Sequence, residues 1–147
     1  MIWWKERRMS KKQQEIDVFV NYVRKYCKKA NIRLEFRRGA WLYTDERHKA
    51  DGFFQEPENS IHGRIVIAKG VPDKEWLTTL GHEFGHVLQW MEDSPLYHDK
   101  NDYHAERDAE RRSRKLMKDF NLPVPNIWHR KQSRNYLTWY KRHRRKP

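Results

Sequence analysis

Apolar positions recur at helical spacing in three segments of the chain, and the first of these is residues 11–30. Ser10 stands at the expected N-cap of this helix with Gln13 at the capping-box position, and Asn31 stands where the helix should end. The apolar residues of the segment form one stripe: Ile16, Phe19, Val20, Val23, Tyr26 and Cys27. Such a stripe predicts a helix that packs one face against a core.

The second helical segment, residues 71–91, is the most apolar of the three. Pro72 and Asp73 suit a first turn, because a missing N–H and a negative charge are both favourable there. The apolar positions again trace one face: Trp76, Leu77, Leu80, Phe84, Val87, Leu88 and Met91. Gly81 and Gly85 cost this helix roughly 1 kcal/mol each relative to alanine. We therefore expect another element to pack closely against the helix at these glycines.

The third helical segment, residues 102–120, is mostly charged, and its small or apolar residues are Ala109, Ser113, Leu116, Met117 and Phe120. Glu106 extends their face by one turn, and Glu110 lies at its edge. A different row is fully charged and is predicted to face solvent: Asp108, Arg112, Lys115 and Asp119. The spacing thus predicts that Glu106, rather than Asp108, is the inward carboxylate.

Strand patterns occupy the sequence between the first two predicted helices. Residues 53–54 and 61–68 flank the turn-rich E-P-E-N-S, which predicts a β-hairpin whose second strand, R-I-V-I-A, is partly buried. An earlier pair of strands, 32–37 and 41–44, flanks Arg38 and Gly39 and is expected to complete a small, mostly antiparallel sheet. The order of elements predicts an α+β fold, with one domain over residues 1–120 (core about 10–120) and an extension over 121–147.

The most informative motif is H-E-F-G-H at residues 82–86, inside the second helix. On a helix, His82 and His86 lie one turn apart on one face, so that both imidazoles can bind the same ion. Glu83 then lies beside the ion, where it can act as the acid/base. This H-E-x-x-H pattern is the signature of zincin metallopeptidases and predicts one Zn²⁺ per chain. A catalytic zinc needs a third protein ligand, and the inward-facing Glu106 fits that role.

The helix that follows makes the resemblance more specific. H-E-x-x-H followed after some 20 residues by a helix with Glu106 and Glu110 resembles the gluzincin branch of the zincins. The resemblance implies that Glu106 is the third ligand and that Glu110, where the family usually has Asp or Asn, orients a ligand histidine.

The segment E-R-D-A-E (106–110) resembles the E-x-E-A-N run of ImmA/IrrE-type small peptidases, and the strand before the active helix is similar to theirs. The resemblance implies a minimal zincin-like fold. It also implies that the strand before the active helix lies at the edge of the cleft, where the substrate main chain adds to it. The alternative is that this strand is an ordinary core strand.

Two assignments stay open. SprT-like peptidases take a histidine as third ligand, which leaves His98 as an alternative to Glu106; His104 fits less well because it shares the row of Asp108. The group that supports the oxyanion during hydrolysis is also unassigned among four residues: Tyr97, His98, Tyr103 and Tyr136.

Charge is concentrated at the two ends of the chain. The net charge is +12, of which residues 1–30 contribute +6, residues 31–120 contribute −2 and residues 121–147 contribute +8. In the last segment aromatic residues alternate with cations, a composition that suits contact with phosphates and bases. The same composition equally fits an anionic membrane surface or acidic protein partners, or aromatic residues that pack back onto the domain. The residues of the predicted nucleic-acid contact are Arg130, Lys131, Arg134, Trp139, Lys141, Arg142, Arg144 and Arg145.

The remaining features concern the cellular setting. A single cysteine, Cys27, is typical of a reducing compartment, and the N-terminus has no signal-peptide pattern. No stretch approaches the ~20 apolar residues of a membrane span, so we expect a soluble cytoplasmic protein. One interpretation associates it with the nucleoid. The favoured function is a zinc metallopeptidase acting on a protein or peptide, such as a DNA-bound regulator. The alternatives are a nucleic-acid-binding protein with a structural zinc and, ranked last, an inactive interaction module.

Overall fold

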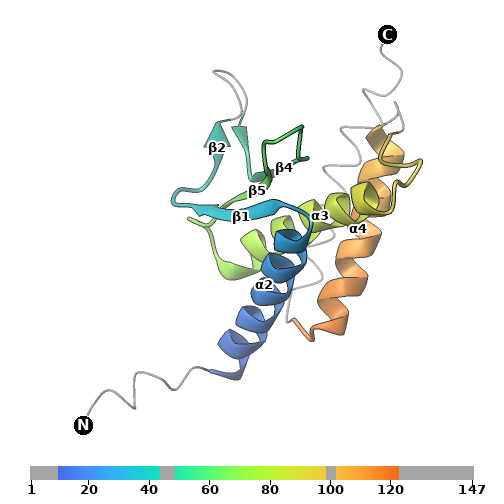
Figure 1. Ribbon diagram of the computed structural model, residues 1–147. Helices are drawn as coiled ribbons and strands as arrows, with labels where there is room; N and C mark the ends of the chain where they lie inside the picture. The colour runs from blue at the N-terminus through green and yellow to red at the C-terminus, as the bar shows by residue number, and fades with distance from the viewer. Residues whose placement is uncertain (1–9, 44–48, 99–101, 123–147) are drawn as a thin grey trace.

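The computed structural model describes residues 10–43, 49–98 and 102–122 (Figure 1). The helices are α2 (Lys11–Lys29), α3 (Asp73–Met91) and α4 (Asp102–Asp119). The strands are β1 (Ile32–Arg37), β2 (Leu42–Tyr43), β3 (Lys49–Ala50), β4 (Gly52–Gln55) and β5 (Gly63–Ala68). Helices together with a small mixed sheet confirm the predicted α+β class, and each helix ends within a residue or two of its predicted bounds.

The three-stranded sheet has the order β1-β5-β4, in which β1 is parallel to β5 and β4 is antiparallel to it. The predicted hairpin of β4 and β5 is confirmed, with Phe54 opposite Ile65. The predicted pairing of strands 32–37 and 41–44 is wrong, because β2 instead pairs with β3 in a separate two-stranded sheet. Burial explains the difference: beside β5, Ile32 and Leu34 of β1 become part of the core.

The strand before the active helix, β5, lies in the centre of the described three-stranded sheet, which agrees with the alternative of an ordinary core strand. The expectation that a substrate main chain adds to this strand is wrong, because both of its sides are already paired. β5 is hydrogen-bonded on both sides, and Ile65, Val66, Ile67 and Ala68 are all buried. A nearly continuous apolar run belongs in the interior of a sheet, whereas the less apolar β4 can tolerate an edge. Among the described strands, β4 is therefore the edge strand next to α3.

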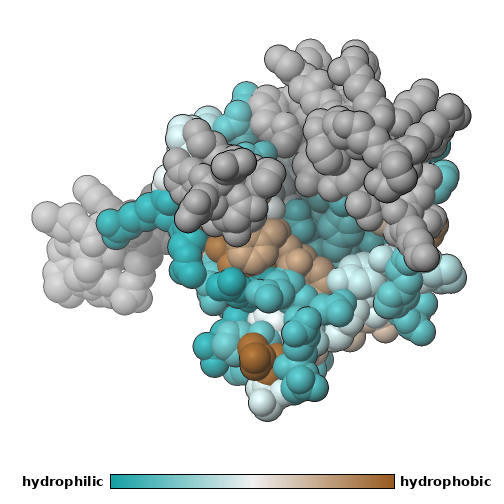
Figure 2. Space-filling view, turned by 90° about the horizontal axis from the view of Figure 1, so that it is seen from above, coloured by the Kyte–Doolittle hydropathy of each residue, from teal (hydrophilic) through white to brown (hydrophobic). Residues whose placement is uncertain are grey.

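The main core lies between one face of this sheet and the helices (Figure 1). α2 begins as predicted, because the Ser10 hydroxyl accepts a hydrogen bond of 3.1 Å from the Gln13 amide. Side chains of α2, β1, β5 and α3 meet there, including Phe19, Ile65 and Phe84, each 0% exposed. On the face seen in Figure 2 most of the described surface is hydrophilic. No described helix is long and apolar enough to cross a membrane.

Candidate metal centre

The helices α3 and α4 pack closely at the two glycines of α3. A Cβ atom added to Gly81 would lie 2.4 Å from the Ser113 Oγ, and one added to Gly85 would lie 2.5 Å from the backbone oxygen of Ala109. Ala109 and Ser113 are themselves 0% exposed. The expected close packing at the H-E-x-x-H motif is thus confirmed, and it brings the acidic side chains of α4 next to the histidines of α3.

Three predicted ligands converge at this contact. One atom each of His82, His86 and Glu106 lie within 4.8 Å of one another. The two oxygens of Glu106 face the two rings, at 2.5 Å from His82 Nε2 and 3.0 Å from His86 Nε2. All three side chains are largely buried. The group could therefore hold a metal ion between the Nε2 atoms and the carboxylate.

The second nitrogen of each ring is held by a further side chain. His82 Nδ1 lies 2.8 Å from Glu110 Oε2, and His86 Nδ1 lies 2.9 Å from Gln89 Oε1. When Nδ1 donates these hydrogen bonds, each Nε2 keeps its lone pair, which can then bind a metal ion held between the two rings and Glu106. The contact of Glu110 is the one that the resemblance implied, whereas Gln89 was not anticipated.

Gln89 links His86 to α4. Its side chain is 0% exposed, and its Nε2 donates to the Ala105 backbone oxygen at 2.8 Å and to Asp108 Oδ2 at 3.0 Å. The spacing of three residues between His86 and Gln89 on one helix is a signal that could have predicted their contact.

Asp108 contradicts the sequence analysis, which placed it in solvent. It is only 8% exposed, and besides Gln89 it accepts hydrogen bonds of 2.7 Å from Arg111 and from Arg112. Burial opposes its charge, but the hydrogen bonds from Arg112, Gln89 and Arg111 outweigh burial and lower its pKa to about 2. A carboxylate paired in this way can remain charged at the edge of the helix contact. The spacing of apolar residues along one helix does not predict such a pairing.

Glu83 is 7% exposed and close enough to the three ligands to interact with His86, His82 and Glu106. Its carboxylate accepts a hydrogen bond from the Phe54 backbone amide of β4. Burial raises its pKa, while the two imidazoles and the Phe54 amide oppose that shift. A carboxylate with a raised pKa is a better proton acceptor near neutral pH than a solvated one.

The electrostatic balance of the cluster favours a cation. Three largely buried carboxylates, Glu83, Glu106 and Glu110, surround two imidazoles. Burial disfavours the charged form of His82, yet its hydrogen bonds to Glu106 and Glu110 raise its pKa to about 10. Burial also opposes the charge of Glu106, but the two imidazoles lower its pKa to about 2. Two imidazole nitrogens and a carboxylate in a negatively charged setting are a ligand set that fits Zn²⁺.

Tyr97, one of the residues predicted to support the oxyanion, interacts with Glu83. Tyr97 is half-buried, packs its ring near that of Phe54 and donates a 2.8 Å hydrogen bond to Glu56. Burial, then Glu56, and to a smaller extent Glu83, raise the pKa of the Tyr97 hydroxyl. Tyr97 is thus close enough to Glu83 for the two groups to interact.

His98 does not join the three ligands. The His98 side chain is 59% exposed and pairs with Asp93 at 2.9 Å, and it does not belong to the group of ligand atoms. Tyr103 packs against the ring of the exposed His104. Tyr136 and the basic and aromatic residues predicted to contact nucleic acid lie outside the described residues.

Comparison with family models, with curated proteins and with solved structures finds no match for this chain. The described residues form an α+β fold with a buried His/His/Glu group that could hold a metal ion.

Proposed function

We propose that this protein is a zinc-dependent metallopeptidase of the zincin type that hydrolyses peptide bonds of a protein or peptide substrate. The observation that carries the proposal is the convergence of His82, His86 and Glu106 beside the buried carboxylate of Glu83. A structural zinc site usually closes all four positions with protein ligands and has no use for an adjacent base. Three ligands and a base are the set that hydrolysis requires.

The chemistry divides between the metal and the chain. Zinc held by His82, His86 and Glu106 would lower the pKa of a water molecule towards ~7 and polarise the scissile carbonyl. The Glu83 carboxylate removes a proton from the attacking water and delivers it to the leaving amine nitrogen. The hydrogen bond from the Phe54 amide supports this role because it fixes the orientation of the Glu83 carboxylate.

The position of β4 indicates how a substrate would bind. The Phe54 amide points to Glu83, and the N–H and C=O of one strand residue point to the same side, so the edge of β4 away from β5 faces the site. An extended peptide that pairs with this edge would bring its main chain past Glu83. This assigns to β4 the substrate-binding role that the resemblance gave to the following strand.

Tyr97 is the proposed support for the oxyanion, because its hydroxyl interacts electrostatically with Glu83, whereas His98 is exposed and pairs with Asp93. Removal of one such donor typically costs about 10²-fold to 10³-fold in kcat. We expect Tyr97→Phe to lower kcat by about this factor while zinc stays bound. Steady-state kinetics with metal analysis checks this, and equal kcat values for Tyr97→Phe and wild type would remove Tyr97 from the mechanism.

The proposed activity is tested by cleavage of a peptide library with zinc-loaded protein. Wild type should cleave a subset of peptides, and Glu83→Gln should lose cleavage but keep its zinc, because Gln cannot accept the proton. Glu58→Gln is the matched control, since it makes the same change at an exposed residue. Full activity of Glu83→Gln, or zinc-loaded wild type that cleaves nothing in the library, would contradict the proposal.

A further inference from the structure

The surface of α4 that faces solvent carries charge of nearly one sign. Within residues 103–119, every exposed side chain except Asp119 at the end of the helix is basic. We call these residues the basic face: His104, Arg107, Arg111, Arg114, Lys115 and Lys118. Their spacing of three and four residues places them in one band along the helix, roughly 21 Å long at 1.5 Å per residue.

This arrangement is unfavourable for an isolated helix. Pairs such as Arg107 and Arg111, or Arg111 and Lys115, stand four residues apart with equal charge, and like charges at that spacing destabilise a helix. A solvent-exposed helix face normally mixes both signs. An external polyanion would compensate this repulsion.

The acids of α4 do not neutralise the basic face at its surface. Asp108 and Glu110 are 8% and 6% exposed, and they are directed at Gln89 and His82 respectively. Arg111 pairs with Asp108 at 2.7 Å, and Arg114 pairs with Glu110 at 3.9 Å. The two arginine side chains nevertheless remain 67% and 52% exposed. For Arg107, Lys115 and Lys118 the structure records no ion pair with another described residue.

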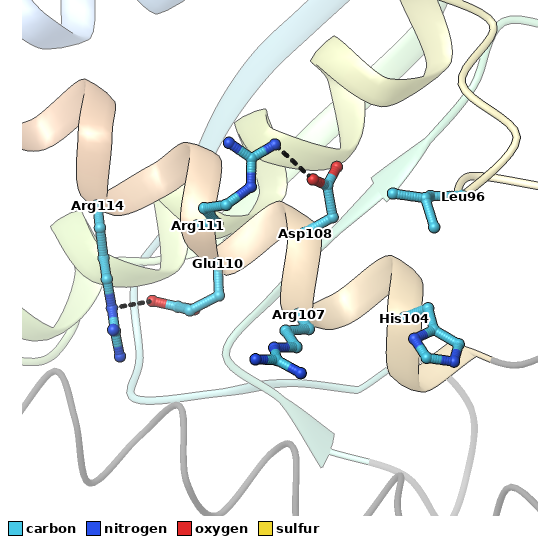
Figure 3. A pocket seen from close by; sticks show the side chains of 7 residues that line it. All are labelled: Leu96, His104, Arg107, Asp108, Glu110, Arg111 and Arg114. Carbon is cyan, nitrogen blue, oxygen red and sulfur yellow. Dashed lines mark hydrogen bonds and ion pairs between the residues drawn. The ribbon is translucent and has the colours of Figure 1, made fainter.

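The basic face also borders a pocket of about 510 Å³ (Figure 3). His104, Arg107, Arg111 and Arg114 line it together with Leu96 and the partly covered Asp108 and Glu110. In Figure 3, Arg107 and His104 point away from Asp108, so that basic side chains stand on more than one side of the pocket. Leu96 is the single apolar residue in the described lining, whereas the core of a protein–protein interface is rich in apolar and aromatic groups.

We propose that the basic face of α4 binds the phosphate backbone of a nucleic-acid strand. Arginine pairs with phosphate through a planar fork of donors, and three arginines in one band match the repeating charge of a strand. The net charge of +12 would draw such a polyanion to the protein from a distance. In the sequence, the residues of the basic face belong to the predicted catalytic segment and not to the basic ends of the chain. The nucleic-acid site does not depend on the metallopeptidase proposal.

The test measures binding of a fluorescently labelled single-stranded DNA by the full chain, over a series of salt concentrations. The variant is Arg107→Gln with Lys115→Gln, which removes two charges and retains helix propensity. The matched control is Lys25→Gln with Lys28→Gln, which removes the same charge from exposed positions of α2. Circular dichroism shows whether all three proteins keep their helices.

Loss of two phosphate contacts should lower the slope of log K against log salt by about 1.4 and weaken binding roughly 10-fold to 30-fold near 0.1 M salt. The α2 control should weaken binding far less. Equal effects of the two pairs, or no effect of the α4 pair, would overturn the proposal. Equally tight and equally sensitive binding of polyglutamate would also overturn it, and would assign the basic face to acidic proteins instead.

Discussion

At the level of single residues, a side chain forms a hydrogen bond with the Nδ1 atom of each histidine of the candidate site. Glu110 bonds His82 and Gln89 bonds His86, so each ring is fixed with its Nε2 towards Glu106. Groups that orient a ligand in this way are worth about 10-fold to 100-fold in metal affinity. Because Gln89 is also hydrogen-bonded to Asp108, the orientation of His86 depends on α4 as well as on its own helix.

Substitution of Gln89 tests this role. Gln89→Met keeps a similar volume but cannot accept the His86 hydrogen bond, so we expect zinc affinity to fall by about 10-fold to 100-fold. Competition with a chromophoric chelator measures the affinity. Gln55→Met serves as the control, since Gln55 is exposed on β4. An unchanged zinc affinity of Gln89→Met would show that the orientation of His86 does not depend on this bond.

At the scale of elements, the contact between α3 and α4 sets the geometry of the site. The sequence predicted both helices, because hydrophobic periodicity is local, and the costly Gly81 and Gly85 predicted their close packing. The sequence did not predict the pairing of β1 with β5, because a parallel partner some 30 residues away leaves no local signal. Asp108 was misplaced for a related reason: its burial depends on Gln89, which belongs to another helix.

The helix contact makes a prediction for the two glycines. Gly85→Ala would place a methyl group 2.5 Å from the Ala109 backbone oxygen, so α4 must move and zinc affinity should fall at least tenfold. Gly81→Ala meets the Ser113 Oγ at 2.4 Å, a side-chain atom that Ser113→Ala removes. The nearest remaining atoms are then the Met117 Sδ at 3.3 Å, at the end of a flexible side chain, and the Cβ of residue 113 at 3.5 Å. The double variant Gly81→Ala/Ser113→Ala should therefore bind zinc better than Gly81→Ala. Chelator competition decides, and a Gly85→Ala protein that binds zinc like wild type would contradict the packing argument.

At the scale of the whole molecule, the described structure combines two chemistries on the two sides of α4. One side turns Glu106 and Glu110 towards the histidines of α3, and the other presents the basic face. The helix is thus acidic where it is buried and basic where it is exposed, and both patterns follow from its helical spacing. A metallopeptidase built in this way could act on proteins that are themselves bound to nucleic acid.

The most direct test of the central claim is the zinc content of purified protein, measured by mass spectrometry for wild type, Glu106→Ala and Asp119→Ala. Asp119 is an exposed acid on the same helix, so its variant controls for the loss of one carboxylate. We expect about one zinc per chain in wild type and in Asp119→Ala, and little or none in Glu106→Ala. Equal zinc in all three proteins would place the third ligand elsewhere, and no zinc in any of them after refolding with the metal would contradict the zinc site altogether.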